Sequence, residues 1–514
     1  MKDNPDYLPF FKDYKYPFVL FVLSFTLYSW VFFSNWLIGS DEGQFLFIAK
    51  LITEGQILYV DINTNRSPIP FYLAAFFMWL SHDNLHFVRL LVPLFNFLTS
   101  LIIYQIGKEN WNLNVGKIAS VLYLMGFSMP LFEEINLMTE PFELFFGTFA
   151  IYYYLEFKKS EKNDHLFFSG IFVGLSFLSK QYGLLFFTVI FVYEALLLFY
   201  ERGFENRLRF MKVNTLVLMG FLSPILIFLG IFFITGHLNA VIDIYFGETA
   251  SQAGSLISVP NMSIFLRAVI GFSVVYVFAL FFTGVTLLDF VETRKVKLAH
   301  FLLIWAFIFS LLMAISTSGP YLVHTLPPSV LMAAIVIESR LGISFTFPEK
   351  YFGAIKKNIK FNSLVAVLLA ISLSTNFWVI YSLDDRQTLD DQKEIANYIK
   401  YNTEENETIL VYHYAPVHYY LSERDPPYVD FRVLNIGPGY LMDGKLEELL
   451  IAIQEDDVKY LIVYKNMLEP DILKDEKYPA TAELKKFFLN NYNLEEEGFQ
   501  EYDIYYRQSN SEWI

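Results

Sequence analysis

The sequence predicts a polytopic α-helical membrane protein with about eleven transmembrane helices and a C-terminal extracytoplasmic α/β domain. Three observations lead to this fold class. Hydrophobic residues make up 54% of the 514 residues, with 55 Phe and 34 Tyr. Apolar runs near the length of a membrane span recur along most of the chain, and the final part abruptly becomes acidic.

The apolar runs are the predicted spans. The run 166–200 is too long for one crossing, and Ser179–Gly183 interrupts it, so we interpret it as two helices joined by a turn at the interface. The run 68–80 is too short to span and is expected to be a juxtamembrane helix in the first outer loop. The predicted spans are 16–38, 88–107, 118–132, 139–157, 166–180, 182–200, 214–235, 267–288, 300–316, 326–340 and 362–382.

Lys and Arg in the short loops predict the orientation. Alternate loops are basic, whereas the loops 133–138, 236–266 and 317–325 contain no Lys or Arg. We therefore expect a multi-pass protein of the cell membrane with a cytoplasmic N-terminus, so that the tail domain lies outside. The basic positions are Lys108, Lys117, Lys158, Lys159, Lys162, Arg202, Arg207, Arg209, Lys212, Arg294, Lys295 and Lys297.

The net charge of −15 lies in the tail, because residues 384–514 hold 28 acidic and 13 basic side chains. This change in charge along the sequence predicts a membrane domain over 1–383 and a soluble domain over 384–514. Strands are expected at Thr408–Tyr414 and Tyr460–Tyr464, and helices at Asp391–Tyr401, Lys445–Ile453 and Ala482–Asn490. An acidic tail argues against nucleic acid as a partner, and the lack of cysteine excludes disulfides and thiolate chemistry.

Polar side chains gather in the predicted outer loops, against an aromatic-rich membrane domain. The adjacent acids Asp41 and Glu42 follow the first span closely, where carboxylates are costly unless water or a partner receives them. The other candidates are Arg66, Glu140, Glu143, Lys180, Gln181, Tyr182, Tyr321 and His324.

These residue types suit glycosyl transfer from a phosphate leaving group. One carboxylate must accept the acceptor's proton, and fixed positive charge must stabilise the departing phosphate. Asp41 or Glu42 can supply the first, while Arg66 and Lys180 can supply the second.

At these positions the chain resembles the GT-C polyprenyl-phosphate-sugar glycosyltransferases, in the group of the protein O-mannosyltransferases and aminoarabinose transferases (glycosyltransferase family 39-like). The resemblance covers roughly residues 16–340 in order and topology. The departures are Asn65 and Gln44, which stand where the aminoarabinose enzymes carry a Glu and a basic residue. The matching motifs are Asp41-Glu42, Gly55…Tyr59-x-Asp61…Arg66-Ser67-Pro68-Ile69, Thr139-Glu140-Pro141 and Gly174-Leu-Ser-Phe-Leu-Ser-Lys180-Gln-Tyr-Gly183.

The resemblance implies a GT-C-like membrane domain with Asp41 as the general base, and we add the hypothesis that Glu42 or Glu140 helps to orient the acceptor. It also implies that Arg66 and Lys180 bind the donor phosphate. Substrate contacts are expected from Glu143, Gln181, Tyr182, Tyr321 and His324.

The predicted activity is that of an inverting glycosyltransferase. It moves a sugar from a polyprenyl-phosphate (dolichyl or undecaprenyl) carrier to a protein, lipid or glycan acceptor outside the cytoplasm. The sequence requires no cofactor. An outer carboxylate site is compatible with Mg²⁺ or Mn²⁺, but the sequence shows no closed ligand set, so a metal site is left open.

Alternatives remain for single residues and for the whole chain. Asp41 and Glu42 could begin an interfacial helix, Glu140 could start a span, Lys180 could snorkel, and Arg66 could anchor its loop to lipid. The whole chain could be a transporter or flippase of lipid-linked intermediates. It could also be an envelope-assembly protein whose tail binds partners.

Overall fold

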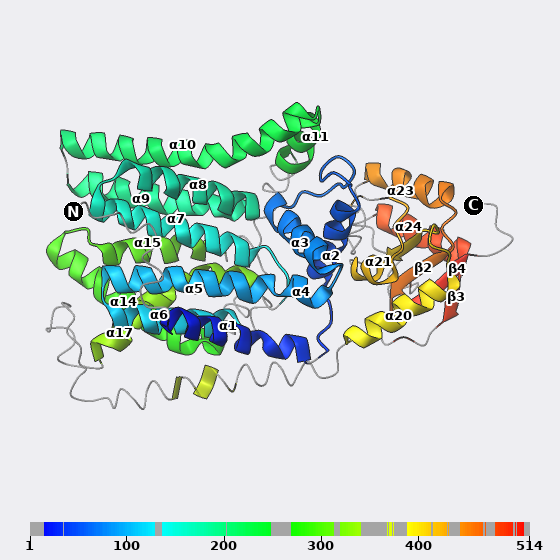
Figure 1. Ribbon diagram of the computed structural model, residues 1–514, viewed down its shortest axis with the longest axis horizontal. Helices are drawn as coiled ribbons and strands as arrows, with labels where there is room; N and C mark the ends of the chain where they lie inside the picture. The colour runs from blue at the N-terminus through cyan, green and yellow to red at the C-terminus, as the bar shows by residue number, and fades with distance from the viewer. Residues whose placement is uncertain are drawn as a thin grey trace.

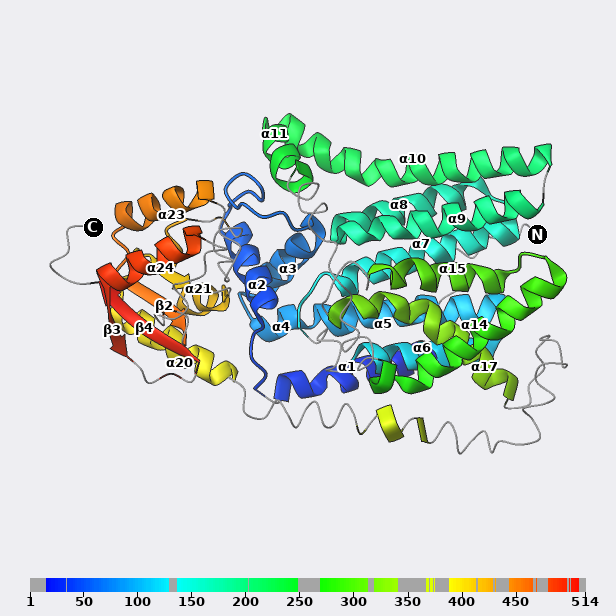
Figure 2. The same ribbon diagram turned by 180° about the vertical axis from the view of Figure 1, so that it is seen from behind.

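A computed structural model describes the chain over most of both predicted domains. The described residues are 15–33, 35–128, 136–201, 203–247, 269–312, 319–340, 367–368, 370–372, 374, 388–412, 415–428, 430, 443–465, 468, 479–496, 499 and 501–507. Long helices lie side by side along the long axis of the molecule, the tail domain lies at one end, and the shorter helices of residues 40–89 lie between the two (Figures 1 and 2).

Long helices fill ten of the eleven predicted apolar runs. Most of the eleventh run, 362–382, lies outside the described residues. The helices are α1 (Lys15–Phe33), α5 (Leu91–Asn110), α6 (Leu113–Phe127), α7 (Glu140–Ser160), α8 (Asn163–Ser179), α9 (Leu184–Tyr200), α10 (Phe204–Ile234), α14 (Ser273–Thr293), α15 (Leu298–Ser310) and α17 (Leu326–Arg340).

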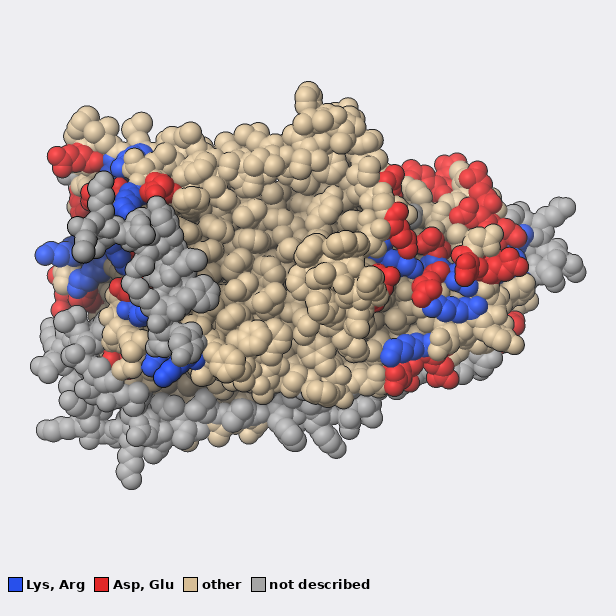
Figure 3. All heavy atoms as spheres, in the orientation of Figure 1, with Lys and Arg blue, Asp and Glu red and all other residues tan. Residues whose placement is uncertain are grey.

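Six described segments are long and apolar enough to cross a membrane, namely Lys15–Phe33, Leu85–Asn110, Gln181–Tyr200, Phe204–Ile234, Ser273–Thr293 and Tyr321–Ser339. On the face shown in Figure 3, the described charged side chains gather towards the two ends, and an uncharged belt separates them. The prediction of a mostly helical membrane protein is therefore confirmed, while the count of eleven crossings stays a prediction.

Small residues let helices of the bundle approach closely. A Cβ atom added at Gly170 of α8 would lie 2.1 Å from the carbonyl oxygen of Val217, and one at Gly220 of α10 would lie 2.1 Å from that of Phe167. Such contacts between backbones are typical of membrane bundles. Lipid tails are as apolar as the side chains of a neighbouring helix, so close packing rather than the hydrophobic effect holds the helices together. The turn that ends α8 belongs to the site described below.

The first outer loop is largely helical. The segment that follows the first span forms helix α2 (Ser40–Thr53), so the interfacial helix that Asp41 and Glu42 could begin is present. The short apolar run forms α3 (Pro68–Ser81), as predicted, and α4 (Leu85–Arg89) leads into α5. Further turns follow elsewhere: η3 (Gln181–Gly183), α11 (Leu238–Val241), η4 (Ile242–Gly247) and η5 (Gly319–Thr325).

The tail is an α/β unit built on a mixed four-stranded sheet in the order β1-β2-β4-β3. Strands β1 (Ile409–Tyr412) and β2 (Tyr460–Tyr464) are parallel, and the pairs β2–β4 and β3–β4 are antiparallel. The two predicted strands and three predicted helices are confirmed. The remaining elements are α20 (Leu389–Asn402), α21 (Val417–Ser422), α23 (Asp443–Glu455), α24 (Pro479–Asn491), β3 (Tyr492–Glu496) and β4 (Tyr502–Arg507).

The sequence did not predict β3, β4 or α21. The predicted domain junction near residue 383 lies outside the described residues, so that boundary stays a prediction. The tail packs against the membrane domain through α21, which lies on α2. The start of α2 is consequently enclosed by both parts of the chain.

Candidate active site

Asp41 and Glu42 lie in the first turn of α2. The helix begins after Gly39, whose carbonyl oxygen accepts a hydrogen bond from Gly43 N at 2.7 Å. The unpaired N–H groups at a helix start favour nearby carboxylates. Adjacent residues of a helix point in different directions, so the two acids meet different surroundings.

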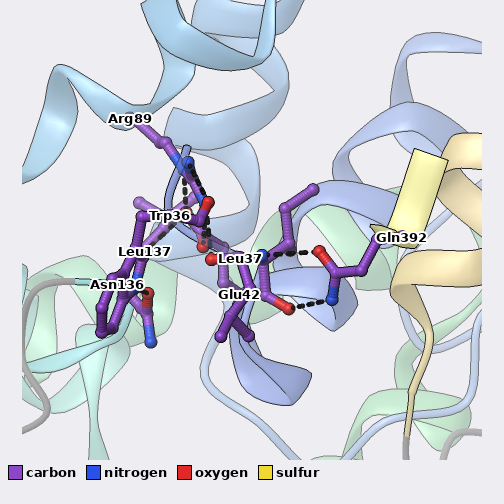
Figure 4. A network of polar contacts seen from close by, with 8 residues as sticks. Trp36, Leu37, Glu42, Arg89, Asn136, Leu137 and Gln392 are labelled. Carbon is purple, nitrogen blue, oxygen red and sulfur yellow. Dashed lines mark hydrogen bonds and ion pairs between the residues drawn. The ribbon is translucent and has the colours of Figure 1, made fainter. Parts of the chain in front are cut away.

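Glu42 is fully buried in a two-point ion pair with Arg89 of α4. Its Oε1 accepts from Arg89 Nε at 2.9 Å and its Oε2 from Nη2 at 2.8 Å (Figure 4). The guanidinium also donates to the carbonyl oxygens of Trp36 and Leu37, at 3.2 and 3.0 Å. Glu42 therefore joins α2 to α4 and to the segment that precedes α2.

Asp41 is about one-third exposed, at 32% of its side-chain surface, and forms an ion pair with Arg66. Arg66 lies in the loop before α3, and its carbonyl oxygen accepts a hydrogen bond from the Tyr59 hydroxyl at 2.7 Å. Its guanidinium lies over the ring of Phe45, one turn along α2 from Asp41, at 5.8 Å. An accessible acid and an accessible cation thus face each other at the surface of α2.

A second ion pair joins Lys180 to Glu140. Lys180 is the extended residue that ends α8, and Glu140 begins α7. Glu140 is buried, and the ammonium lies over the rings of Tyr321 and Tyr182, at 4.7 and 5.5 Å. Aromatic faces favour a cation electrostatically, so three side chains hold this lysine in place.

Glu143 and His324 form a third, fully buried pair one turn farther along α7. His324 Nε2 lies 2.7 Å from Glu143 Oε2, and Nδ1 lies 3.1 Å from the carbonyl oxygen of Tyr321. A carbonyl oxygen only accepts, so Nδ1 is placed as the donor to Tyr321, and Nε2 faces the carboxylate of Glu143. The pair therefore joins η5 to α7 out of contact with solvent.

The segments carrying Arg66 and Lys180 are joined by a hydrogen bond. Gln181 Nε2 donates to the carbonyl oxygen of Asn65 at 3.1 Å, so the residues that follow Lys180 and precede Arg66 are in contact. Ser67 Oγ and the Tyr245 hydroxyl lie 3.1 Å apart and add a contact from η4. These contacts link the loop of Arg66 to the turn after α8 and to η4.

Two residues near this region were absent from the sequence-based candidates. Arg89 is a basic residue at the very start of an apolar run, which is a usable signal for a buried partner. Gln392 of α20 hydrogen-bonds the backbone of Ile38. The sequence around it has the pattern of an ordinary amphipathic helix. Only the tertiary fold reveals this contact.

The described residues do not form a ready-made metal site. Among them, no group of three or more His, Asp or Glu side chains is placed to hold an ion. The carboxylates of Asp41, Glu140 and Glu143 each face a cationic or protonatable side chain instead. We therefore derive no step through a metal.

The membrane domain matches a known family over part of its length. A model of the dolichyl-phosphate-mannose-protein mannosyltransferase family matches residues 65–228, a segment that includes Arg66, Glu140 and Lys180. The resemblance stated from the motifs is thereby confirmed over this segment. No curated protein matches the chain.

Solved structures of low sequence identity share the fold along nearly the whole chain. ArnT from Cupriavidus metallidurans superimposes with a TM-score of 0.59 at 11% identity, covering 95% of this chain and 97% of that one. Its structure bound to undecaprenyl phosphate gives 0.59 at 13%, covering 96% and 98%. The oligosaccharyltransferase AglB from Archaeoglobus fulgidus, in complex with an inhibitory peptide and a dolichol-phosphate, gives 0.56 at 13%, covering 97% and 75%.

Proposed function

We propose that Asp41 is the general base of an inverting glycosyl transfer. The family match and the GT-C fold support a membrane glycosyltransferase with a lipid-phosphate-linked sugar donor. The sugar moves from a polyprenyl phosphate to an acceptor outside the cytoplasm. The observation that carries this proposal is the accessible ion pair Asp41–Arg66 beside the more buried pair Lys180–Glu140, on segments joined by Gln181.

The two cations are suited to receive a phosphate. Arg66 can contact phosphate oxygens at two points, and Lys180 supplies a compact charge beside them. Both carry a carboxylate counterion, so their positions are fixed before the donor arrives. An incoming phosphate competes with Asp41 and Glu140 for these cations and brings its negative charge to the same place.

This exchange gives Asp41 its chemical role. A carboxylate held by a cation is a weaker proton acceptor than one whose cation has been taken by phosphate. The freed carboxylate accepts the proton of the acceptor nucleophile, which attacks the anomeric carbon as the carbon–oxygen bond to the phosphate breaks. The polyprenyl phosphate leaves with both electrons of that bond, and Arg66 and Lys180 stabilise its charge.

The remaining sequence-predicted residues take supporting roles in this proposal. Glu140 holds Lys180, Tyr182 and Tyr321 cover the ammonium, and Gln181 ties the two cation-bearing segments together. Glu143, one turn along α7 from Glu140, forms a buried pair with His324 of η5. Because Glu42 is buried with Arg89, we assign it to the framework of the site rather than to proton transfer.

Chain orientation belongs to the same proposal. The basic loops are assigned to the cytoplasm, and the ends of the helices near α2, together with the tail, are assigned to the outer side. The relatives named above bind undecaprenyl phosphate or dolichol-phosphate. A polyprenyl phosphate donor and an acceptor outside the cytoplasm fit this arrangement.

Transfer by purified protein tests the proposal. Protein in detergent is incubated with radiolabelled polyprenyl-phosphate sugars and a membrane extract as acceptor source. We expect Asp41→Asn to fold and to lose transfer by about 100-fold or more, as expected when a general base is removed. Glu54→Gln, near the exposed end of the same helix, is the matched control and should transfer normally.

Near-normal transfer by a folded Asp41→Asn variant would show that another group accepts the proton. The same protein reconstituted in lipid vesicles tests the flippase alternative: movement of the labelled lipid between the leaflets without release of its sugar would favour a flippase.

A further inference from the structure

The segment before α2 is held by a side chain from the tail domain. Gln392 Oε1 accepts from Ile38 N at 2.8 Å, and Gln392 Nε2 donates to the carbonyl oxygen of Ile38 at 2.9 Å. Both residues are buried. A single amide therefore satisfies both backbone groups of a residue 354 positions away in the chain (Figure 4).

The opposite side of this segment is held by the membrane domain. Arg89 donates hydrogen bonds to the carbonyl oxygens of Trp36 and Leu37, and Trp36 Nε1 donates to Asn136 Oδ1 at 3.1 Å. In Figure 4, Arg89 and Gln392 approach the start of α2 from different sides. The segment thus bridges the two domains immediately before the turn that carries Asp41.

The tail also contacts α2 beyond Asp41. A Cβ atom added at Gly43 would lie 2.7 Å from the backbone nitrogen of Val417, so α21 packs directly on the α2 backbone. One turn later the rings of Phe47 and Tyr419 stack, with centroids 5.5 Å apart. Tail contacts therefore lie on both sides of Asp41 along the chain.

The loop of Arg66 is in contact with the tail as well. Asn63 forms an isolated parallel bridge with Asp430, a fully buried tail residue. Each partner of the Asp41–Arg66 pair is consequently within three residues of a backbone contact with the tail. The position of one relative to the other depends on where the tail sits.

The helix start itself offers little to fix its own direction. Its N-cap is Gly39, which provides no side-chain hydrogen bond and adopts more backbone conformations than other residues. Without the Gln392 amide, the N–H and carbonyl of Ile38 would be buried without these partners, which is unfavourable enough to move the segment. Such a movement would be passed on to Asp41, three residues later.

We propose that Gln392 is a positioning residue of the transferase: by holding both backbone groups of Ile38, it sets the direction of the first turn of α2 and aims Asp41 at the acceptor. This inference rests on the proposed role of Asp41. It gives the tail domain a part in the chemical step, because a side chain of the tail orients the helix turn that carries Asp41.

Gln392→Met is the informative variant, since methionine has a similar length but makes neither hydrogen bond. A displacement of about 1 Å at a reacting group can reduce a rate by up to about 100-fold. We expect kcat of the folded full-length protein to fall about 10- to 100-fold, while KM for the donor stays within about twofold, because Arg66 and Lys180 are untouched. Gln392→Glu keeps the acceptor for Ile38 N but sets a second acceptor oxygen against the carbonyl oxygen of Ile38, so its kcat should also fall.

Gln454→Met is the matched control, because Gln454 is an exposed residue of α23, another helix of the tail. It should leave both constants unchanged. The amount of folded protein is measured by gel filtration before each assay, so that loss of fold is separated from loss of rate.

An unchanged kcat per folded molecule in both Gln392 variants would overturn the inference and leave Gln392 with a purely structural role. An equal loss through donor KM would also overturn it, since it would place the effect on donor binding. Failure of the proposed function is recognised separately: Asp41→Asn would then retain transfer, whatever the Gln392 variants do.

Discussion

The ion pair of Glu42 with Arg89 predicts that Glu42 acts through stability rather than chemistry. Both side chains are almost completely buried, at 0% and 2% exposure, and two hydrogen bonds of 2.9 and 2.8 Å join them. Glu42→Gln preserves the shape and removes the charge, so a buried guanidinium is left without its counterion. Breaking a buried pair in this way costs about 3–5 kcal/mol of unfolding free energy.

The cost should largely disappear when both charges are removed. Replacing buried ion pairs by apolar residues of similar volume is often neutral or stabilising by about 1–4 kcal/mol. In Glu42→Leu with Arg89→Met, part of this gain is offset because the carbonyl oxygens of Trp36 and Leu37 lose a donor. We therefore expect the double variant to be more stable than Glu42→Gln and somewhat less stable than the wild type.

Thermal unfolding in detergent, followed by tryptophan fluorescence, measures the stability of each variant. Transfer is measured in parallel at a temperature where all variants remain folded. Glu54→Gln, on the same helix but exposed, is the control for loss of a carboxylate from α2. The argument would be refuted by a Glu42→Gln protein that melts like the wild type and yet loses transfer as completely as Asp41→Asn, since Glu42 would then take part in the reaction.

Two further predictions concern the tail domain. Burial lowers the pKa of His418 from its ordinary 6.5 to about 3, so the folded chain keeps this imidazole neutral while the unfolded chain takes up a proton below about pH 6.5. This contribution to stability is complete above that pH and is lost as the pH falls, by about 2 kcal/mol at pH 5. We therefore expect His418→Leu to reduce the pH dependence of the melting temperature. Equal pH dependence in the variant and the wild type would contradict this. The chain has no native cysteine, so Gln454→Cys, on an exposed face of α23, should react with a membrane-impermeant maleimide added outside intact cells, and labelling only after lysis would reverse the proposed orientation.

The sequence was sufficient to predict the membrane helices because their signal is local. An apolar run has to be about as long as the membrane is thick, whatever packs against it. Even the interruption at Ser179–Gly183 was recognisable, and the structure ends α8 and begins η3 there. The helix α2 after the first span was expected only as an alternative, in which Asp41 and Glu42 begin an interfacial helix, because the composition of that segment is mixed.

The arrangement of the candidate site was only partly predictable. The order of motifs along the chain singled out Arg66, Glu140 and Lys180, but it did not say which acid would face which cation. Those pairings depend on how α7, α8 and the loop before α3 lie against each other. Gln392 shows the limit most clearly, because its two hydrogen bonds reach a residue 354 positions away and leave no trace in local sequence.

The same limit applies to the adjacent pair Asp41 and Glu42, which sequence alone treats as chemically equivalent. The helix turns one of them into the interior, where Arg89 neutralises it in surroundings of low dielectric and water cannot replace either partner. The other stays one-third exposed beside a cation that is itself 28% exposed, so a phosphate entering from solvent can compete for that cation. An ion pair that solvent and substrate can reach is exchangeable, whereas one that they cannot reach is part of the framework. Accessibility of the counterion, rather than the identity of the acid, is therefore the physical reason to assign proton transfer to Asp41.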